Sequence, residues 1–267
     1  MKVENDERLI LLTNDDGIYA GGIKRLTEIM EEYGKVVVIA ATESRSGMSQ
    51  ALTVKTPIRV KLLEETERKR VYVCSGTPAD GVKIAISRLL ERRPDWVVSG
   101  INHGSNASVS VIYSGTMAAA IEGCLYGISS VGFSLNDFSS DANFNNLTGS
   151  LRGILDTLAE NPLPPGVCLN VNFPSCSEED IKGIRVCRQA AGSWQEEFDK
   201  RKDPMGKTYY WLTGVFMNQE PEAEDTDEWA IANGYVSVVP VSVDMTAHAH
   251  LDDMRKIFEN GTAKKTQ

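Results

Sequence analysis

The residues of this chain best suited to chemistry are oxygen donors that follow three separate apolar runs. They are Asn14, Asp15, Asp16, Ser46, Asn102 and Asn106. Two carboxylates with a hydroxyl and amide carbonyls suit Mg²⁺, Mn²⁺ or Ca²⁺, and no Cys or His cluster accompanies them to favour zinc or copper. Such a cation keeps coordination positions for water and for phosphate oxygens. It can polarise a phosphoryl group and lower the pKa of a bound water, so the pattern predicts metal-assisted hydrolysis of a phosphoester.

The apolar runs before these donors are typical of buried strands. Residues 10–13, 36–41 and 95–100 are short and largely apolar, and residues 22–33 have helical periodicity. A strand, a helix and a second strand at this spacing predict a parallel sheet with a right-handed crossover. Ligands of such sheets bind outside the carboxyl ends of the strands, so we expect the donors to converge there.

The rest of the chain continues this α/β pattern. We expect a hairpin at 52–73 with a solvated turn, strands at 127–135, 167–171, 184–186, 209–212 and 235–241, and helices at 81–90, 117–123, 146–158 and 251–258. Ser114, Gly115 and Thr116 precede one helix and could present amides and hydroxyls to an anion. The proline cluster 161–166 is the best candidate boundary, whereas the polar, aromatic stretch 193–229 fits an extended arm better than a separate core.

The composition excludes several classes of protein. With 267 residues, 42% of them hydrophobic, the chain can bury a sizeable core. A formal net charge of −9 argues against binding a nucleic acid polymer or a membrane surface, since both need clustered Lys and Arg. The five cysteines form no CxxC pair, which argues against disulfides or structural zinc. No apolar stretch is long enough for a membrane span or a signal peptide, so we expect a cytoplasmic protein.

Six short motifs occur in one order along the chain. They are residues 11–17, 45–47, 76–80, 98–106, 113–116 and 244–248. Together they resemble the SurE (survival protein E) family of metal-dependent 5'/3'-nucleotidases. The resemblance implies one α/β domain over residues 1–267, with a Rossmann-like three-layer core, a mainly parallel sheet and a C-terminal extended β arm at about 193–230. It also implies that the arm joins subunits into a homodimer or homotetramer.

The resemblance further implies an activity and a set of site residues. The activity is hydrolysis of nucleoside 5'-monophosphates, with 3'-monophosphates and short polyphosphate as further substrates. One divalent cation, Mg²⁺ or Mn²⁺ with Ca²⁺ or Co²⁺ as alternatives, would be held at positions matching Asp15, Asp16, Ser46 and Asn102. The residues expected to bind the phosphate are Asn14, Gly47, Asn106, Ser114, Gly115 and Thr116.

We expect Asp15, Asn106 and Ser114 to be the catalytic residues. Asp15 would orient or deprotonate a water that attacks the phosphate in line, while groups near Ser114 stabilise charge on the equatorial oxygens. One departure from the family pattern is visible at residues 41–43, where alanine, threonine and glutamate stand in place of alanine, proline and aspartate. Loss of that proline should loosen the loop that carries Ser46.

Two other functions stay open on the sequence alone. One is a nucleotide-binding stress-response module without turnover, against which the paired Asp15 and Asp16 argue. The other is an aspartyl-phosphate phosphatase, which needs two carboxylates separated by one residue, whereas here they are adjacent. His103 could act as a general acid beside Asn102, although a loop histidine is more commonly a surface or scaffold group.

Overall fold

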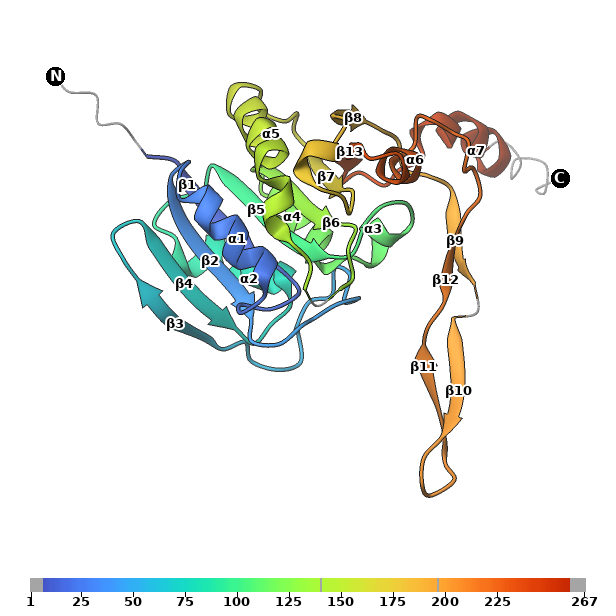
Figure 1. The fold of residues 1–267 in the computed structure, drawn as a ribbon, viewed down its shortest axis with the longest axis horizontal. Coiled ribbons are helices and arrows are strands. Elements are labelled where there is room, and N and C mark those ends of the chain that lie inside the picture. The colour runs from blue at the N-terminus through green and yellow to red at the C-terminus, as the bar shows by residue number, and fades with distance from the viewer. Residues whose placement is uncertain (1–6, 140, 196, 260–267) are drawn as a thin grey trace.

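A nine-stranded, mainly parallel sheet forms the centre of the computed structural model, which describes residues 7–139, 141–195 and 197–259 (Figure 1). The strand order is β3-β4-β2-β1-β5-β6-β7-β13-β8. These strands are β1 (Leu9–Thr13), β2 (Lys35–Ala41), β3 (Val60–Glu65), β4 (Lys69–Cys74), β5 (Trp96–His103), β6 (Ser129–Leu135), β7 (Val167–Phe173), β8 (Ile184–Val186) and β13 (Val236–Ser242). The neighbouring strands β4, β2, β1, β5, β6 and β7 run parallel to one another. Strand β3 runs antiparallel to β4, and β13 runs antiparallel to β7.

Helices cover both faces of the sheet and confirm the predicted three-layer α/β architecture (Figure 1). One face packs against α1 (Gly21–Met30) and α5 (Thr148–Glu160), and the other against α2 (Pro78–Ile84) and α4 (Gly115–Leu125). Successive residues of a strand point to opposite faces, so each parallel strand needs apolar side chains on both. Strand β1 meets this need because all five of its residues are buried.

Most elements lie within two residues of the sequence predictions. The hairpin predicted at 52–73 is an exception, because its first strand β3 begins only at Val60. Helix α1 ends three residues early, because the chain must turn after Met30 to bring Gly34 against the backbone of Arg8. Helix α2 begins at Pro78 after the cap Thr77, as the sequence around the helical stretch 81–90 predicts. Thr77 and Asp80 form a capping box by bonding each other's backbone amides, and the helix continues as a π-helical turn over Ala85–Leu89.

The carboxyl ends of β1, β2 and β5 meet at one edge of the sheet. Strands β2 and β5 flank β1 in parallel, with Leu12 opposite both Val38 and Val98. Strand β5 runs to His103, three residues beyond the predicted end, since it pairs with β6 there. Asn102 therefore lies on a strand, where the sequence had predicted a loop.

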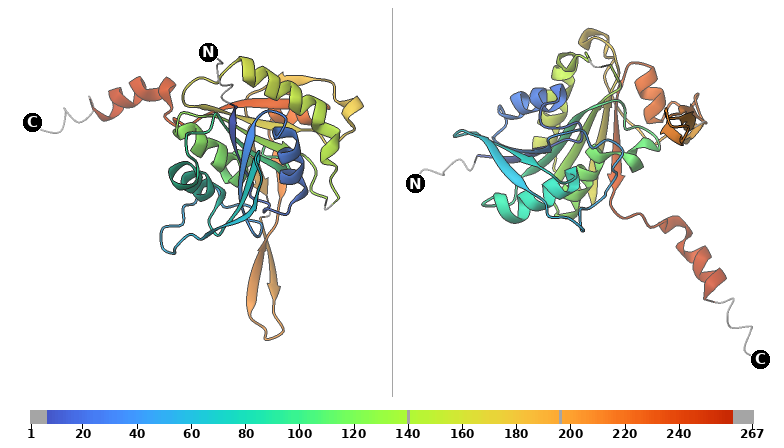
Figure 2. Two further views of the ribbon diagram at one scale, coloured as in Figure 1. Left: turned by 90° about the vertical axis from the view of Figure 1, so that its left-hand side faces the viewer. Right: turned by 90° about the horizontal axis from the view of Figure 1, so that it is seen from below.

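The predicted arm is a long antiparallel hairpin that projects away from the sheet (Figures 1 and 2). Strand β9 (Gly192–Gln195) pairs with β12 (Val215–Asn218), and β10 (Phe198–Lys202) pairs with β11 (Thr208–Leu212). Beyond the arm, α6 (Asp227–Ala232) returns to β13, so the extended part ends before residue 230.

The described chain also contains two further α-helices and short 3-10 helices at Phe144–Leu147, Glu178–Asp180 and His248–His250. Helix α3 (Ser110–Tyr113) precedes α4, and α7 (Leu251–Phe258) extends away from the core (Figure 2). Within the described ranges, every helix is too short or too polar to cross a bilayer. The proline cluster 161–166 leads directly into β7, which pairs with β6, so the sheet continues across it.

Candidate active site

The turn after β1 positions the two adjacent carboxylates. The side-chain amide of Asn14 closes this turn, because Nδ2 donates to the Gly17 carbonyl (3.0 Å) and Oδ1 accepts from the Gly17 amide (3.2 Å). Gly17 has φ near +100°, a conformation that other residues rarely adopt. Asn14 is fully buried and both ends of its amide serve the turn, so its predicted contact with phosphate stays a prediction.

The carboxylate of Asp15 lies against the N-terminus of α4. The Thr116 hydroxyl donates a 2.6 Å hydrogen bond to Asp15 Oδ1, and a Cβ on Gly115 would lie 2.8 Å from Oδ2. Asp15 is 3% exposed. Burial raises the pKa of Asp15, while the Thr116 hydroxyl and the amides of Thr116 and Gly115 act in the opposite direction. Gly115 and Thr116 at the start of α4, which the sequence predicts to bind phosphate, therefore contact the carboxylate of Asp15.

Asp16 contacts the end of β5. Its Oδ2 accepts a hydrogen bond from the His103 amide (3.1 Å), which links the turn after β1 to the neighbouring strand. Burial, followed by the negative charge of Asp15, raises the pKa of Asp16 to about 6. The ring of His103 packs edge-on against Phe144, with 4.8 Å between centroids. In this structure His103 thus contributes its backbone to the site.

The loop that carries Ser46 is joined to the same turn. The Arg45 amide donates a 2.6 Å hydrogen bond to the Asp15 carbonyl. Ser46 itself is exposed, and its hydroxyl shares a 2.7 Å hydrogen bond with that of Ser44. Gly47 has φ near +70° and open space around it. The structure therefore brings this loop to Asp15 through the backbone, with the Ser46 side chain open to solvent.

Asn102 and Asn106 lie on either side of the turn at Gly104. Asn102 Nδ2 donates to the carbonyls of Gly104 (2.8 Å) and His103 (3.1 Å). The side-chain oxygen Oδ1 takes no part in these two hydrogen bonds and points away from the two carbonyls. Asn106 is 6% exposed, and its Nδ2 donates to the Ser134 hydroxyl (2.8 Å). An amide nitrogen carries two hydrogens, so a second N–H can serve a ligand.

Ser114 caps the helix that contacts Asp15. Its hydroxyl oxygen accepts a hydrogen bond from the Met117 amide (3.0 Å), and the residue is almost fully buried. A hydroxyl that accepts in this way keeps its own hydrogen to donate to an anion. The arrangement is thus compatible with a contact between Ser114 and a phosphate oxygen.

The chemistry of the donor set fits a hard divalent cation. In the described part of the chain neither Asp15 nor Asp16 forms an ion pair, and no three Asp, Glu, His or Cys residues gather as a ligand cluster. The pKa values of the buried Asp15 and the half-buried Asp16 are both raised, and a divalent cation would lower them again. Hydroxyl and amide oxygens at Ser46 and Asn102 suit Mg²⁺ or Mn²⁺.

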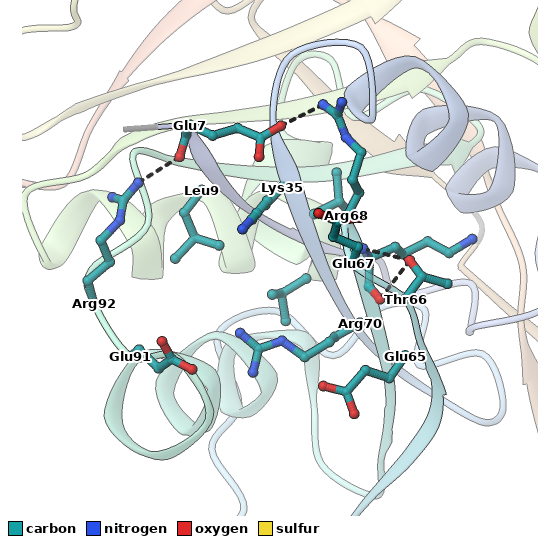
Figure 3. A pocket seen from close by; sticks show the side chains of 13 residues that line it. Glu7, Leu9, Lys35, Glu65, Thr66, Glu67, Arg68, Arg70, Glu91 and Arg92 are labelled. Carbon is teal, nitrogen blue, oxygen red and sulfur yellow. Dashed lines mark hydrogen bonds and ion pairs between the residues drawn. The ribbon is translucent and has the colours of Figure 1, made fainter. Parts of the chain in front are cut away.

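A large cavity of about 800 Å³ lies at the opposite ends of the strands, away from these residues (Figure 3). Leu9 and Lys35, the first residues of β1 and β2, line it. Its charged side chains carry both signs and include an ion pair between Arg68 and Glu7 (2.7 Å). None of the predicted site residues borders this cavity, so its size does not identify the site of chemistry.

Sequence reasoning missed the buried polar residues that surround Asn106. Ser134 lies on β6, and Asn170 and Asn172 lie on β7, all at most 1% exposed. One signal was available, because two asparagines alternate within an otherwise apolar strand, where buried amides need specific partners.

Comparison with known proteins then decides the family. The family model described as "Survival protein SurE" matches residues 10–196. The chain belongs to the SurE family. A SurE relative from Flavobacterium johnsoniae, named 5'-nucleotidase SurE, is 50% identical over 260 residues, covering 97% of this chain and 100% of its own. One from Christiangramia forsetii, with the same name, is 52% identical over 248 residues, covering 92% and 95%.

A solved SurE structure confirms the fold. The SurE protein from Aquifex aeolicus matches with a TM-score of 0.80 at 35% identity, covering 93% of this chain and 99% of that one. The match spans nearly the whole of both chains, so the α/β core predicted from the sequence is the SurE fold.

Proposed function

We propose that this protein is a metal-dependent 5'-nucleotidase that hydrolyses nucleoside 5'-monophosphates to nucleoside and phosphate. The observation that carries this proposal is full-length similarity, at about half of all positions, to relatives named 5'-nucleotidase SurE. The adjacent carboxylates at the carboxyl end of β1, Asp15 buried and Asp16 half-buried, support it, because they can hold a hard cation for this chemistry. We include 3'-monophosphates and short polyphosphate as further substrates.

One divalent cation, Mg²⁺ or Mn²⁺ with Ca²⁺ or Co²⁺ as alternatives, would be held by Asp15, Asp16, Ser46 and Asn102. Bound there, it would polarise the phosphoryl group and lower the pKa of a water. Asp16 serves as a ligand only, whereas Asp15 has a second task. The Thr116 hydrogen bond to its Oδ1 fixes the carboxylate, which would orient the attacking water and accept its proton.

The remaining site residues act on the phosphate. Asn106 Nδ2 and the Ser114 hydroxyl donate hydrogen bonds to its equatorial oxygens, and Gly47 lets the loop backbone approach closely. As the water oxygen bonds to phosphorus, the ester P–O bond breaks in line. The nucleoside oxygen then leaves and takes a proton from solvent.

A substrate panel tests this function. Purified protein freed of metal by a chelator is assayed for phosphate release from 5'- and 3'-nucleotides with Mg²⁺, Mn²⁺, Ca²⁺ or Co²⁺. We expect release only with metal, and loss of turnover in a folded Asp15→Asn variant. Nucleotide binding without release from any substrate would instead establish a binding module. A phosphoenzyme trapped by acid quench would establish an aspartyl-phosphate mechanism.

We also propose that the arm joins copies of this chain into a homodimer or homotetramer within the cytoplasm. Its strand β11 exposes Tyr210, Trp211 and Leu212, of which Trp211 is 57% exposed, and aromatic side chains are enriched at subunit interfaces. Sedimentation of wild type and of Trp211→Glu tests this assembly. A larger species that Trp211→Glu dissociates supports the proposal, whereas a monomeric wild type refutes it.

A further inference from the structure

The loop that carries Asn106 is held by side chains from two neighbouring strands. The Asn106 amide donates to Asn172 Oδ1 (2.8 Å), and its carbonyl accepts from Asn170 Nδ2 (2.8 Å). Its own side-chain Nδ2 donates to the Ser134 hydroxyl (2.8 Å). Every polar group of the Asn106 backbone thus has a partner outside its own loop.

These partners form a connected network. Ser134 on β6 lies opposite Asn172 on β7 in the sheet register, and Asn172 Nδ2 donates to Asn170 Oδ1 (3.1 Å). Asn172 Oδ1 also accepts from the Ser105 hydroxyl (3.2 Å). A buried polar group without a partner is destabilising, so a connected network of this kind favours one arrangement of the loop.

The other end of the loop, at Ser108, is held by two residues that flank the arm, Ala190 before β9 and Asp227 at the start of α6. Asp227 Oδ2 accepts from the Ser108 amide (2.8 Å), and its Oδ1 accepts from the Ala190 amide (2.9 Å). The Ser108 hydroxyl in turn donates to the Ala190 carbonyl (2.8 Å). Ser108 has φ near +50°, which few non-glycine residues adopt, so these contacts hold the backbone in an unusual conformation.

We propose that Ser134 and Asn172 are positioning residues for the phosphate. Asn172 fixes the backbone of Asn106. Ser134 takes one of the two side-chain N–H groups of Asn106, which aims the second N–H at a phosphate oxygen. This inference rests on the phosphate contact proposed above for Asn106. Ser134 lies opposite the proposed metal ligand Asn102 in the sheet register, but its side-chain hydroxyl bonds Asn106, as the side chain of Asn172 bonds the Asn106 backbone. Removal of the hydroxyl, with the strand backbone kept, should therefore act on the phosphate contact.

The expected consequence is a separation between phosphate binding and metal binding. Without the Ser134 hydroxyl, the Asn106 side chain can rotate, and kcat/KM for a nucleotide falls roughly 10- to 100-fold. The affinity for inorganic phosphate falls with it, whereas the affinity for Mn²⁺ in the absence of phosphate does not change. A purely structural residue would lower all three together or only the melting temperature.

The experiment compares two serines of the same strand. Ser134→Ala is the test variant, and Ser130→Ala is the matched control, because Ser130 is equally buried on β6 but donates to the Ile128 carbonyl (2.8 Å). Both are assayed for kcat/KM, phosphate affinity, Mn²⁺ affinity and melting temperature. Asn172→Ala provides a second variant of the network if Ser134→Ala does not fold.

A double-mutant cycle tests whether the effect acts through Asn106. We expect Ser134→Ala to cause no further loss of kcat/KM when combined with Asn106→Ala. Losses that multiply, or equal kcat/KM in Ser134→Ala and Ser130→Ala, would overturn the inference. Wild-type kcat/KM in Asn106→Ala alone would overturn it by removing the phosphate contact on which it rests. Absence of turnover in the wild type would refute the nucleotidase function itself.

Discussion

Thr116 donates a 2.6 Å hydrogen bond to Asp15, although the two residues are 101 positions apart in the chain. The bond joins the turn that follows β1 to the first turn of α4. It fixes the orientation of a buried carboxylate whose charged form is otherwise disfavoured by desolvation. The two residues therefore form one unit of the site.

Replacing Thr116 tests this unit. Valine keeps the shape but loses the hydroxyl, so Thr116→Val should weaken divalent metal binding roughly 10- to 100-fold, the usual range for a residue that orients a metal ligand. Thr116→Ser keeps the hydroxyl and should remain close to wild type. Titration with Mn²⁺ measures both affinities. Equal affinities in the two variants would show that the hydroxyl has no such function.

A methyl group at Gly115 should disturb the same carboxylate. A Cβ there would lie 2.8 Å from both Cβ and Oδ2 of Asp15, closer than real Cβ contacts. Gly115→Ala should therefore lower kcat/KM at least 10-fold, an order of magnitude typical for a displaced catalytic group. Gly153→Ala is the control, because Gly153 lies in α5 with open space around it and should gain about 0.5–1 kcal/mol of stability. Loss of activity in both variants would contradict the prediction.

The raised pKa of Asp16 predicts how metal and pH act together. Its folded pKa of about 6 exceeds the ordinary 3.8, so in metal-free protein this group's contribution to stability is present below about pH 4 and lost as pH rises through 6. A cation binds the ionised form. Added Mn²⁺ should therefore raise the melting temperature more at about pH 7.5 than at about pH 5. Thermal scans at both pH values measure this, and an equal rise at each would refute the prediction.

Glu228 should give a second pH dependence, away from the metal site. Burial, and then the charge of Asp227, raises the pKa of Glu228 to about 7 from the ordinary 4.5. Its contribution to the unfolding free energy is complete below 4.5 and declines as pH rises through 7, by roughly 1 kcal/mol after screening by solvent. Glu228→Gln should flatten this slope, and the exposed Glu222→Gln should leave it unchanged. Urea unfolding across this pH range provides the measurement.

The sequence by itself determined the strands and most of the donors at their ends. Apolar runs such as residues 36–41 are encoded by consecutive residues, and most strands built on such runs appear within two residues of their predicted place. The motifs around Asp15 and Asn102 also identified the family, because a family pattern is a property of the chain order itself.

Only the tertiary structure decided which of these residues support one another. Asn14 closes its own turn, Thr116 orients Asp15, and the surroundings of Asn106 come from β6 and β7. The reason is physical. A hydrogen bond between distant residues depends on which strands become neighbours, and burial makes these bonds specific because an unpaired polar group has no water as a substitute partner. Neither the strand order nor the burial is written in any local stretch of residues.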